Sequence, residues 1–291
     1  MSIPHLLREL YARRSILWPR VRVRKGTAPN RQVIVATAGR VGSTWTCNLL
    51  GAIGLRPGLR LLPQDYIDRN NTLIIDRAAL ALLEVEGFLT WYKSHSLPPE
   101  DYAPAEHPSV RFVTILRDPR DMLVSAADYL AWLDMGLGGK GQEFAKLPEA
   151  ERILALIEEG DWFLDSLERW HRWPHAIKVH YEDLSRDPRS TFGALLEACD
   201  LVPRFDAVAR AVRRNDFAAR SGRQAGVEAK GSFLRKGVAG DWHGKFDDRC
   251  RVRFAEAKEG RWQRLADAIA AARAGTSFAQ LDAASQPSPP R

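Results

Sequence analysis

The sequence predicts an α/β fold, a single domain in which helices flank a central, mostly parallel sheet. Strand-like and helix-like segments alternate along the 291 residues, as they do when a parallel sheet is covered on both faces. The run Val33-Ile34-Val35 is β-branched and uninterrupted, which is typical of a strand buried on both sides. A loop of small residues and then a helical pattern follow this run, which indicates a P-loop-like phosphate-binding loop.

Each element is predicted from its local pattern. Runs of β-branched and aromatic residues predict strands at 33–37, 88–93, 110–116 and 176–180. Apolar residues at helical spacing predict helices at 45–55, 119–133, 151–170, 188–198 and 250–272. The glycine- and lysine-rich segment 135–145 is expected to be a mobile loop. We therefore divide the chain into a basic N-terminal extension (1–30), one domain (31–274) and a disordered tail (275–291).

Composition narrows the class of protein. The net charge of +7 suits an acidic ligand but is modest for a nucleic-acid binder, so we expect no nucleic-acid partner. No segment is apolar enough to span a bilayer, although the basic N-terminus allows peripheral membrane contact. The three cysteines, Cys47, Cys199 and Cys250, are odd in number and widely spaced in the sequence. This pattern favours a reducing compartment and argues against a zinc site. A cytoplasmic location is therefore expected, whereas the oligomeric state cannot be read.

The first motif is the loop after the first predicted strand. Gly39 and Gly42 interrupt the strand, and Ser43 and Thr44 open the helix. Backbone N–H groups at a helix N-terminus attract anions, and Arg40 adds a positive fork. A Walker A loop would carry a lysine before the hydroxyl residue, and this loop has none. The loop is either a cradle for a phosphate-like group or an ordinary strand-to-helix turn.

The second motif follows the strand 110–116. Arg117 stands at the carboxyl end of this strand, where open α/β sheets bind ligands. Ser125 lies two turns along the next helix and is placed to share an anion with Arg117. Arg120 and Asp121 look like surface or capping residues. Taken alone, the motif fits a salt-bridged helix start at least as well as a binding site.

The third motif is Lys93-Ser94-His95, which ends a strand before Pro98. Lys93 and His95 are two residues apart and share one face of an extended segment. A histidine of near-neutral pKa beside a cation and a bound anion is a suitable general base. A histidine at a strand end is, however, more often structural.

The fourth motif is Arg235-Lys236-Gly237, near the C-terminus. Adjacent cations beside a glycine can fold over a phosphate group. As a single motif it is weak, because basic loops are usually just solvated.

Together the four motifs resemble the sulfotransferases that use 3′-phosphoadenosine 5′-phosphosulfate (PAPS) as donor, most closely the soluble, cytosolic type. The motifs occur in the family order between residues 33 and 246. The segment His180-Tyr181-Glu182-Asp183-Leu184 before Asp187-Pro188 adds to the resemblance.

The resemblance implies a role for each motif in holding PAPS and transferring its sulfuryl group in line to a hydroxyl or amine, with no metal. His95 is the implied general base, and Arg40 and Lys93 lie beside the transferring group. The acceptor is a small molecule, a lipid or a carbohydrate. The implied donor-binding residues are Arg40, Val41, Gly42, Ser43, Thr44 and Trp45 at the 5′-phosphosulfate, Arg117, Ser125, Arg235, Lys236 and Gly237 at the 3′-phosphate, and Trp45, Tyr181 and Phe217 at the adenine.

The sequence departs from the family pattern at Arg40. The small-molecule branch usually has lysine at this position, and an arginine cannot give up its proton, so Arg40 is expected to act only as an electrostatic clamp.

Three alternatives stay open, one for the base and two for the function. A carboxylate, Glu84 or Glu86, is a second candidate for the base. A P-loop kinase that uses ATP, or an inert polyanion-binding module, would use the same loop.

Overall fold

The computed structural model describes residues 21–84, 87–137, 142–204, 206–229, 232 and 234–275, and it confirms the predicted α/β fold with a parallel central sheet. The sheet has the strand order β3-β4-β2-β5-β6, and every neighbouring pair is parallel. Its strands are β2 (Arg31–Ala36), β3 (Arg56–Pro57), β4 (Leu89–Ser94), β5 (Val110–Leu116) and β6 (Ala176–His180).

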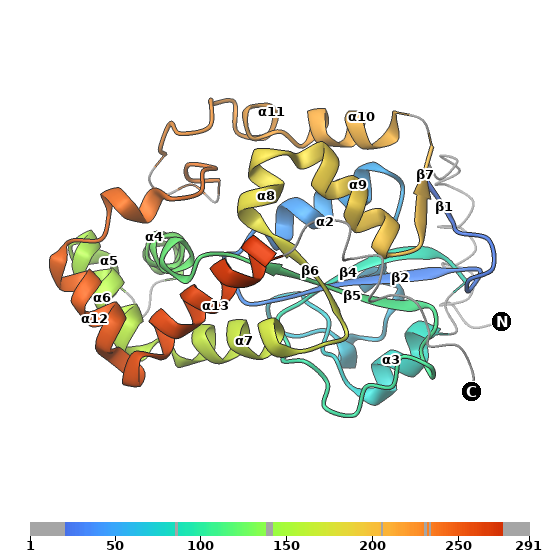
Figure 1. Cartoon of the computed structure of the whole chain (residues 1–291), viewed down its shortest axis with the longest axis horizontal. Helices are drawn as coiled ribbons and strands as arrows, with labels where there is room; N and C mark the ends of the chain where they lie inside the picture. Colours follow the sequence, from blue (N-terminus) through green and yellow to red (C-terminus); the bar gives the residue numbers. More distant parts are fainter. Residues whose placement is uncertain are drawn as a thin grey trace.

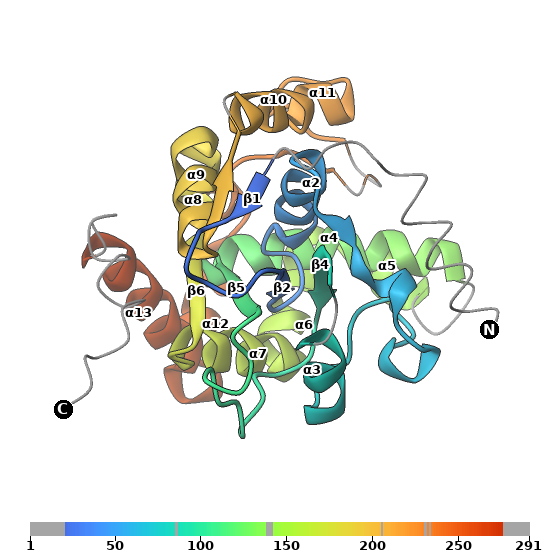
Figure 2. The same ribbon diagram turned by 90° about the vertical axis from the view of Figure 1, so that its right-hand side faces the viewer.

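Helices cover both faces of this sheet (Figures 1 and 2). In both views α2, α8, α9 and α10 lie above the strands, and α3 and α7 lie below them. The described α-helices are α2 (Ser43–Ala52), α3 (Arg77–Glu84), α4 (Pro119–Leu137), α5 (Gln142–Lys146), α6 (Glu149–Glu159), α7 (Asp161–Arg172), α8 (Tyr181–Arg186), α9 (Pro188–Ala198), α10 (Ala207–Arg214), α11 (Phe217–Ser221), α12 (Asp248–Glu256) and α13 (Arg261–Gly275). The described residues also form four short 3-10 helices: η1 (Gly58–Leu61), η2 (Gln64–Tyr66), η3 (Asp241–Gly244) and η4 (Ala257–Gly260).

The central strand β2 divides the core into two clusters. Val33 and Val35 are fully buried in the larger cluster, whereas Ile34 and Ala36 are fully buried in the smaller one. Successive side chains of a strand point to opposite faces, so an uninterrupted apolar run lets β2 bury both of its faces. This explains why the strand that leads into the small-residue loop sits in the middle of the sheet.

Two predicted helices are wrong, because each is in fact two. The predicted helix 151–170 is split into α6 and α7 at Gly160, where a Cβ atom would lie 2.3 Å from the carbonyl oxygen of Leu156. The predicted helix 250–272 is split into α12 and α13, since Lys258 and Glu259 adopt positive φ angles of 54° and 56°. Both breaks turn the chain so that α12 and α13 pack against the earlier helix pair.

The predicted loop 135–145 is also wrong over most of its length. Helix α4 continues to Leu137 and α5 begins at Gln142, which leaves only 138–141 outside the described residues. The glycine-rich stretch is short, and good helix formers flank it on both sides. Of the predicted tail only Gly275 is described, and it ends α13.

One small sheet was not predicted. Strand β1 (Val21–Val23) pairs antiparallel with β7 (Leu201–Pro203), and Val21 is buried. The last part of the predicted N-terminal extension is therefore packed on the domain, whereas residues 1–20 lie outside the described part. Of the described helices, none combines the length and the apolar character that a membrane span requires.

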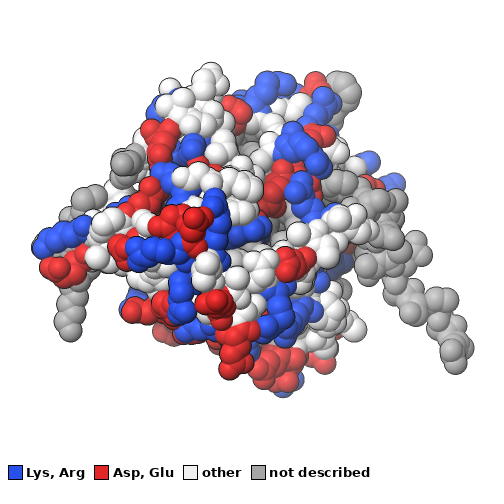
Figure 3. All heavy atoms as spheres, turned by 60° about the vertical axis from the view of Figure 1, so that its left-hand side comes forward, with Lys and Arg blue, Asp and Glu red and all other residues white. Residues whose placement is uncertain are grey.

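Charges of both signs are interspersed on the face shown in Figure 3. Arg249 pairs with Glu151 and Arg253 pairs with Glu158, and these pairs join α12 to α6. Exposed pairs of this kind contribute little to stability, typically about 0.2–1 kcal/mol each. The described part of this face does not gather the excess positive charge into a single patch.

Candidate active site

The loop between β2 and α2 has the backbone of an anion cradle. Arg40 and Gly42 adopt left-handed φ angles of 66° and 105°, and Gly42 caps α2. No described residue accepts a hydrogen bond from the backbone N–H of Gly42, Ser43 or Thr44. These N–H groups and the helix dipole together favour a negative group at this point. A Cβ atom on residue 42 would lie 2.7 Å from the ring of Tyr181, so only glycine fits here.

Arg40 points from this loop toward α4. Its Nε lies 3.3 Å from Oγ of Ser125, and its guanidinium carbon lies 4.1 Å from the centre of the Tyr129 ring. Burial lowers the pKa of Arg40 to about 10, with further lowering from Arg117 and Arg235 and a rise from Tyr129. Arg40 therefore remains positively charged at neutral pH. Its electrostatic coupling to two other arginines shows that positive charge converges on this loop.

Arg117 connects the cradle to the C-terminal segment. Its guanidinium donates to the carbonyl oxygen of Arg40 at 3.1 Å and to that of Val238 at 3.2 Å, and lies 4.2 Å from the centre of the Tyr181 ring. Arg117 is only 6% exposed, and its Nε has no hydrogen-bond partner among the described residues. A buried donor without a partner is costly, so this nitrogen fits a ligand acceptor.

Lys93 and His95 lie on the other side of the cradle, at the carboxyl end of β4. Nζ of Lys93 lies 3.3 Å from Oγ1 of Thr44. Nδ1 of His95 lies 2.9 Å from the carbonyl oxygen of Thr37. Because a carbonyl only accepts, His95 carries its proton on Nδ1 and keeps Nε2 as an acceptor. Burial lowers the pKa of His95, the bond to Thr37 raises it in part, and the charge of Lys93 lowers it.

An exposed aromatic residue flanks this histidine. The rings of His95 and Trp162 are 6.3 Å apart and meet edge to face, and Trp162 is 48% exposed. The base candidate therefore has an apolar surface beside it, reachable from solvent.

The motif around Gly237 packs against α11. Gly237 has a φ of 68°, and a Cβ there would overlap the ring of Phe217. Among the described residues, no acceptor is found for the backbone N–H of Lys236, Gly237 or Val238. The segment thus presents unpaired donors close to Arg117, as an anion site requires.

The interpretation of Asp121 as a surface or capping residue is wrong. Asp121 is 1% exposed and accepts hydrogen bonds from the backbone N–H of Gly240 at 2.6 Å and of Trp242 at 3.0 Å. It therefore fixes the C-terminal segment against α4. The helix is capped instead by Asp118, since its carboxylate accepts a hydrogen bond from the backbone N–H of Arg120.

The structure brings most of the predicted site residues together through direct contacts. Trp45 and Tyr181 meet edge to face with ring centres 6.4 Å apart, and the ring of Tyr181 also contacts Arg117. Glu84, in contrast, accepts from the backbone N–H of Ser109, before β5 begins. Ser109 lies at the amino end of the parallel strands, whereas His95 lies at their carboxyl end. Glu84 is therefore not placed to act as the base. Glu86 lies outside the described residues.

Comparison with known proteins supports these observations. The family model of the sulfotransferase domain matches residues 30–267. Sulfotransferase 1E1 of Mus musculus is 22% identical over 246 residues, and its Rattus norvegicus counterpart is 22% identical over 245; each match covers 77% of this chain and 81% of the relative. Among solved structures, mouse sulfotransferase SULT7A1 complexed with PAP (adenosine 3′,5′-bisphosphate) superposes with a TM-score of 0.57 at 15% identity, covering 86% of this chain and 90% of that one.

A second solved structure is retinol dehydratase in a complex with retinol and PAP, with a TM-score of 0.50 at 19% identity, covering 82% of this chain and 81% of that one. At such identities the solved structures establish a shared fold. The family model, however, extends over most of the chain, and the predicted motifs lie within it. The chain therefore belongs to the sulfotransferase family.

Proposed function

We propose that this sulfotransferase uses PAPS as donor and transfers the sulfuryl group to an acceptor hydroxyl or amine, with His95 as general base. One observation carries the proposal: unpaired N–H groups at the start of α2 lie among Arg40, Arg117 and Lys93, next to a histidine whose tautomer leaves Nε2 free to accept a proton. A strong anion site beside a base is what sulfuryl transfer requires.

In the proposed mechanism, one set of residues binds PAPS and His95 transfers the proton. The backbone of Gly42 to Trp45, with Arg40 and Lys93, would stabilise charge on the sulfuryl oxygens and on the leaving phosphate. Arg117 and Ser125, with the backbone of Lys236 and Gly237, would hold the 3′-phosphate. Nε2 of His95 would take the acceptor proton as the new bond to sulfur forms. Most of the acceleration would come from orientation and electrostatics.

The exposed ring of Trp162 beside His95 supports a small-molecule acceptor with an apolar body. The retinol in the complex of retinol dehydratase is a ligand of that kind. A lipid or carbohydrate acceptor, a cytoplasmic location, and the lack of a metal or nucleic-acid partner stay predictions.

Calorimetric titration with PAP tests the donor site. We expect micromolar binding that requires the 3′-phosphate, so that ADP and adenosine 5′-phosphosulfate bind at least tenfold more weakly. Arg117→Ala should abolish this preference, because Arg117 joins the cradle to the C-terminal segment. Equal binding of ADP and PAP would favour the kinase alternative, and no binding of either would favour an inert module.

The pH dependence of kcat/KM tests the base. His95 must be neutral to accept a proton, and its pKa is lowered from 6.5, mainly by burial. The enzyme should therefore keep its activity through neutral pH and lose it only as the pH falls through a value below 6.5. An acidic limb centred above 7 would contradict this assignment.

A further inference from the structure

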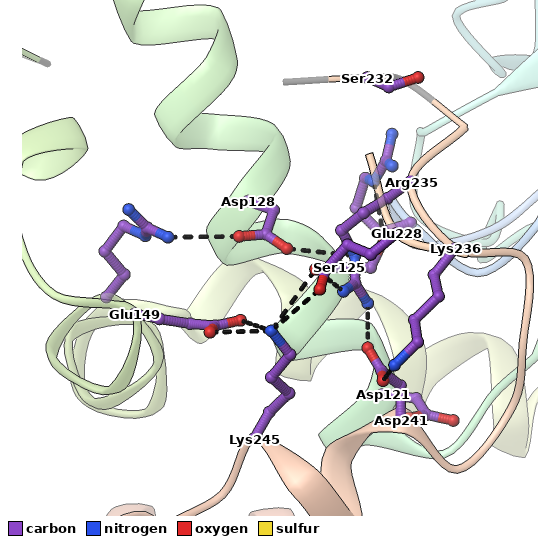
Figure 4. Close-up of polar contacts among 12 residues, drawn as sticks. Asp121, Ser125, Asp128, Glu149, Glu228, Ser232, Arg235, Lys236, Asp241 and Lys245 are labelled. Carbon is purple, nitrogen blue, oxygen red and sulfur yellow. Dashed lines mark hydrogen bonds and ion pairs between the residues drawn. The ribbon is translucent and has the colours of Figure 1, made fainter. Parts of the chain in front are cut away.

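Arg235 lies in a cluster of ion pairs that the four motifs did not predict (Figure 4). Its side chain is 8% exposed, and each of its three nitrogens contacts a different carboxylate. Nε lies 3.1 Å from Asp128, Nη1 lies 2.7 Å from Glu228, and Nη2 contacts Asp241. These contacts use at most three of the five guanidinium N–H groups, and a phosphate that binds Arg235 on the side of Glu228 must replace that carboxylate.

The three carboxylates are not equally easy to replace. The Asp241 side chain is 4% exposed and also binds Lys236, and that of Asp128 is 16% exposed and also binds Arg152 at 3.2 Å. Glu228 is the most exposed of the three, at 25%.

Lys245 is the second partner of Glu228, and it also forms an ion pair with another carboxylate. Nζ of Lys245 lies 3.4 Å from Glu228 but 2.8 Å from Glu149. If the Glu228 carboxylate moves away, Lys245 keeps its shorter ion pair. Burial acts to raise the pKa of Glu228, but the hydrogen bond from Arg235 and the charge of Lys245 lower it, so this carboxylate is ionised at neutral pH.

The cluster borders the residues proposed to hold the 3′-phosphate. Ser125 and Asp128 are three residues apart on α4 and therefore lie on neighbouring positions of one face, as Figure 4 shows. Arg235 is close enough to Arg40 to lower its pKa. Arg235 thus belongs to the same group of positive charges as Arg40.

We propose that Glu228 competes with the 3′-phosphate of the nucleotide for Arg235, while Asp128 and Asp241 keep the guanidinium in position. The inference rests on the proposed function, because it assumes a donor that carries a 3′-phosphate. A dianionic phosphate forms stronger bonds to a guanidinium than a carboxylate does, so the exchange favours the nucleotide but reduces its affinity by the free energy of the lost ion pair. Glu228 thereby sets how tightly the product PAP is held.

Neutralising Glu228 tests this. Glu228→Gln keeps the size of the side chain and removes its charge, and we expect it to tighten PAP binding about tenfold, the scale of one charged hydrogen bond. Binding of adenosine 5′-phosphate, which lacks the 3′-phosphate, should change less than twofold. Glu228→Ala should act in the same direction, so the conclusion does not depend on one variant.

The matched control is Glu149→Gln, which removes the same charge from the same cluster but does not contact Arg235. It should leave PAP affinity nearly unchanged. If Glu149→Gln tightens PAP binding as much as Glu228→Gln does, the effect comes from the loss of a negative charge in general. If Glu228→Gln weakens PAP binding, Glu228 holds Arg235 in position for the phosphate and does not compete with it. Either result overturns the inference while the proposed function stands. If the unaltered protein binds PAP and adenosine 5′-phosphate equally, both fail.

Discussion

His95→Ala should lower kcat by about 10²- to 10⁴-fold, the range that a general base typically contributes. PAP affinity should stay within about twofold, because the contacts proposed for the nucleotide come from the cradle, Arg117 and the C-terminal segment. Single-turnover rates with saturating donor, together with calorimetric titration of PAP, separate the two quantities. Loss of less than tenfold in kcat would exclude His95 as the base.

A control is needed because His95 also has a structural contact. Removing its ring leaves the buried carbonyl oxygen of Thr37 without its donor, which costs about 1–3 kcal/mol. His95→Asn keeps an N–H near the position of Nδ1 but has no basic nitrogen. If His95 acts in proton transfer, the asparagine variant should be as stable as the original protein and as inactive as the alanine variant. Activity recovered by asparagine would instead assign a structural role.

Gly42→Ala should destabilise the protein and its nucleotide site together. The φ of 105° is strained for any residue with a side chain, at about 1–3 kcal/mol, and the new Cβ would lie 2.7 Å from the ring of Tyr181. Overpacking of this kind costs about 1–3 kcal/mol more. Because the Tyr181 ring contacts Arg117, its displacement should also weaken PAP binding by at least about tenfold.

Gly26→Ala separates the two causes. Gly26 has a φ of 85°, but a Cβ there meets nothing within 4 Å. It should lower the free energy of unfolding by the strain alone and leave PAP affinity unchanged. Chemical denaturation of both variants and titration with PAP measure the difference. Equal unfolding effects in the two variants would show that the contact with Tyr181 is not limiting.

The long strands were predicted within two residues at either end, because each carries a short run of β-branched or aromatic residues. The break at Gly160 was missed because one glycine within an apolar helical pattern is usually tolerated. The break before α13 depends on positive φ angles at Lys258 and Glu259, two residue types that give no local signal for such a conformation. Strand β3 is only two residues long and leaves no pattern at all.

The site residues, like the helices and strands, were predicted where the local sequence carries a pattern and missed where it does not. Motif residues such as Arg40, His95 and Arg117 could be predicted because each stands beside a strand end, and a parallel sheet brings such ends to one edge. The cluster around Arg235 was missed because it joins segments that are remote in sequence: Asp128 lies on α4, whereas Glu228 and Asp241 lie near Arg235 in the C-terminal segment. One signal was available, because residues 121, 125 and 128 recur at helical spacing and share a face of α4.

The position of Arg117 has a consequence for how the chain is completed during synthesis. Its two carbonyl partners lie 77 and 121 residues away, in Arg40 and Val238. A ribosome-bound chain that ends before Val238 cannot close the nucleotide site, whatever part of the sheet it has already formed. A ligand that binds only the closed fold stabilises it by about 2.7 kcal/mol at a hundred times its dissociation constant. A nucleotide bound at this site thus stabilises complete molecules and not fragments that end before Val238.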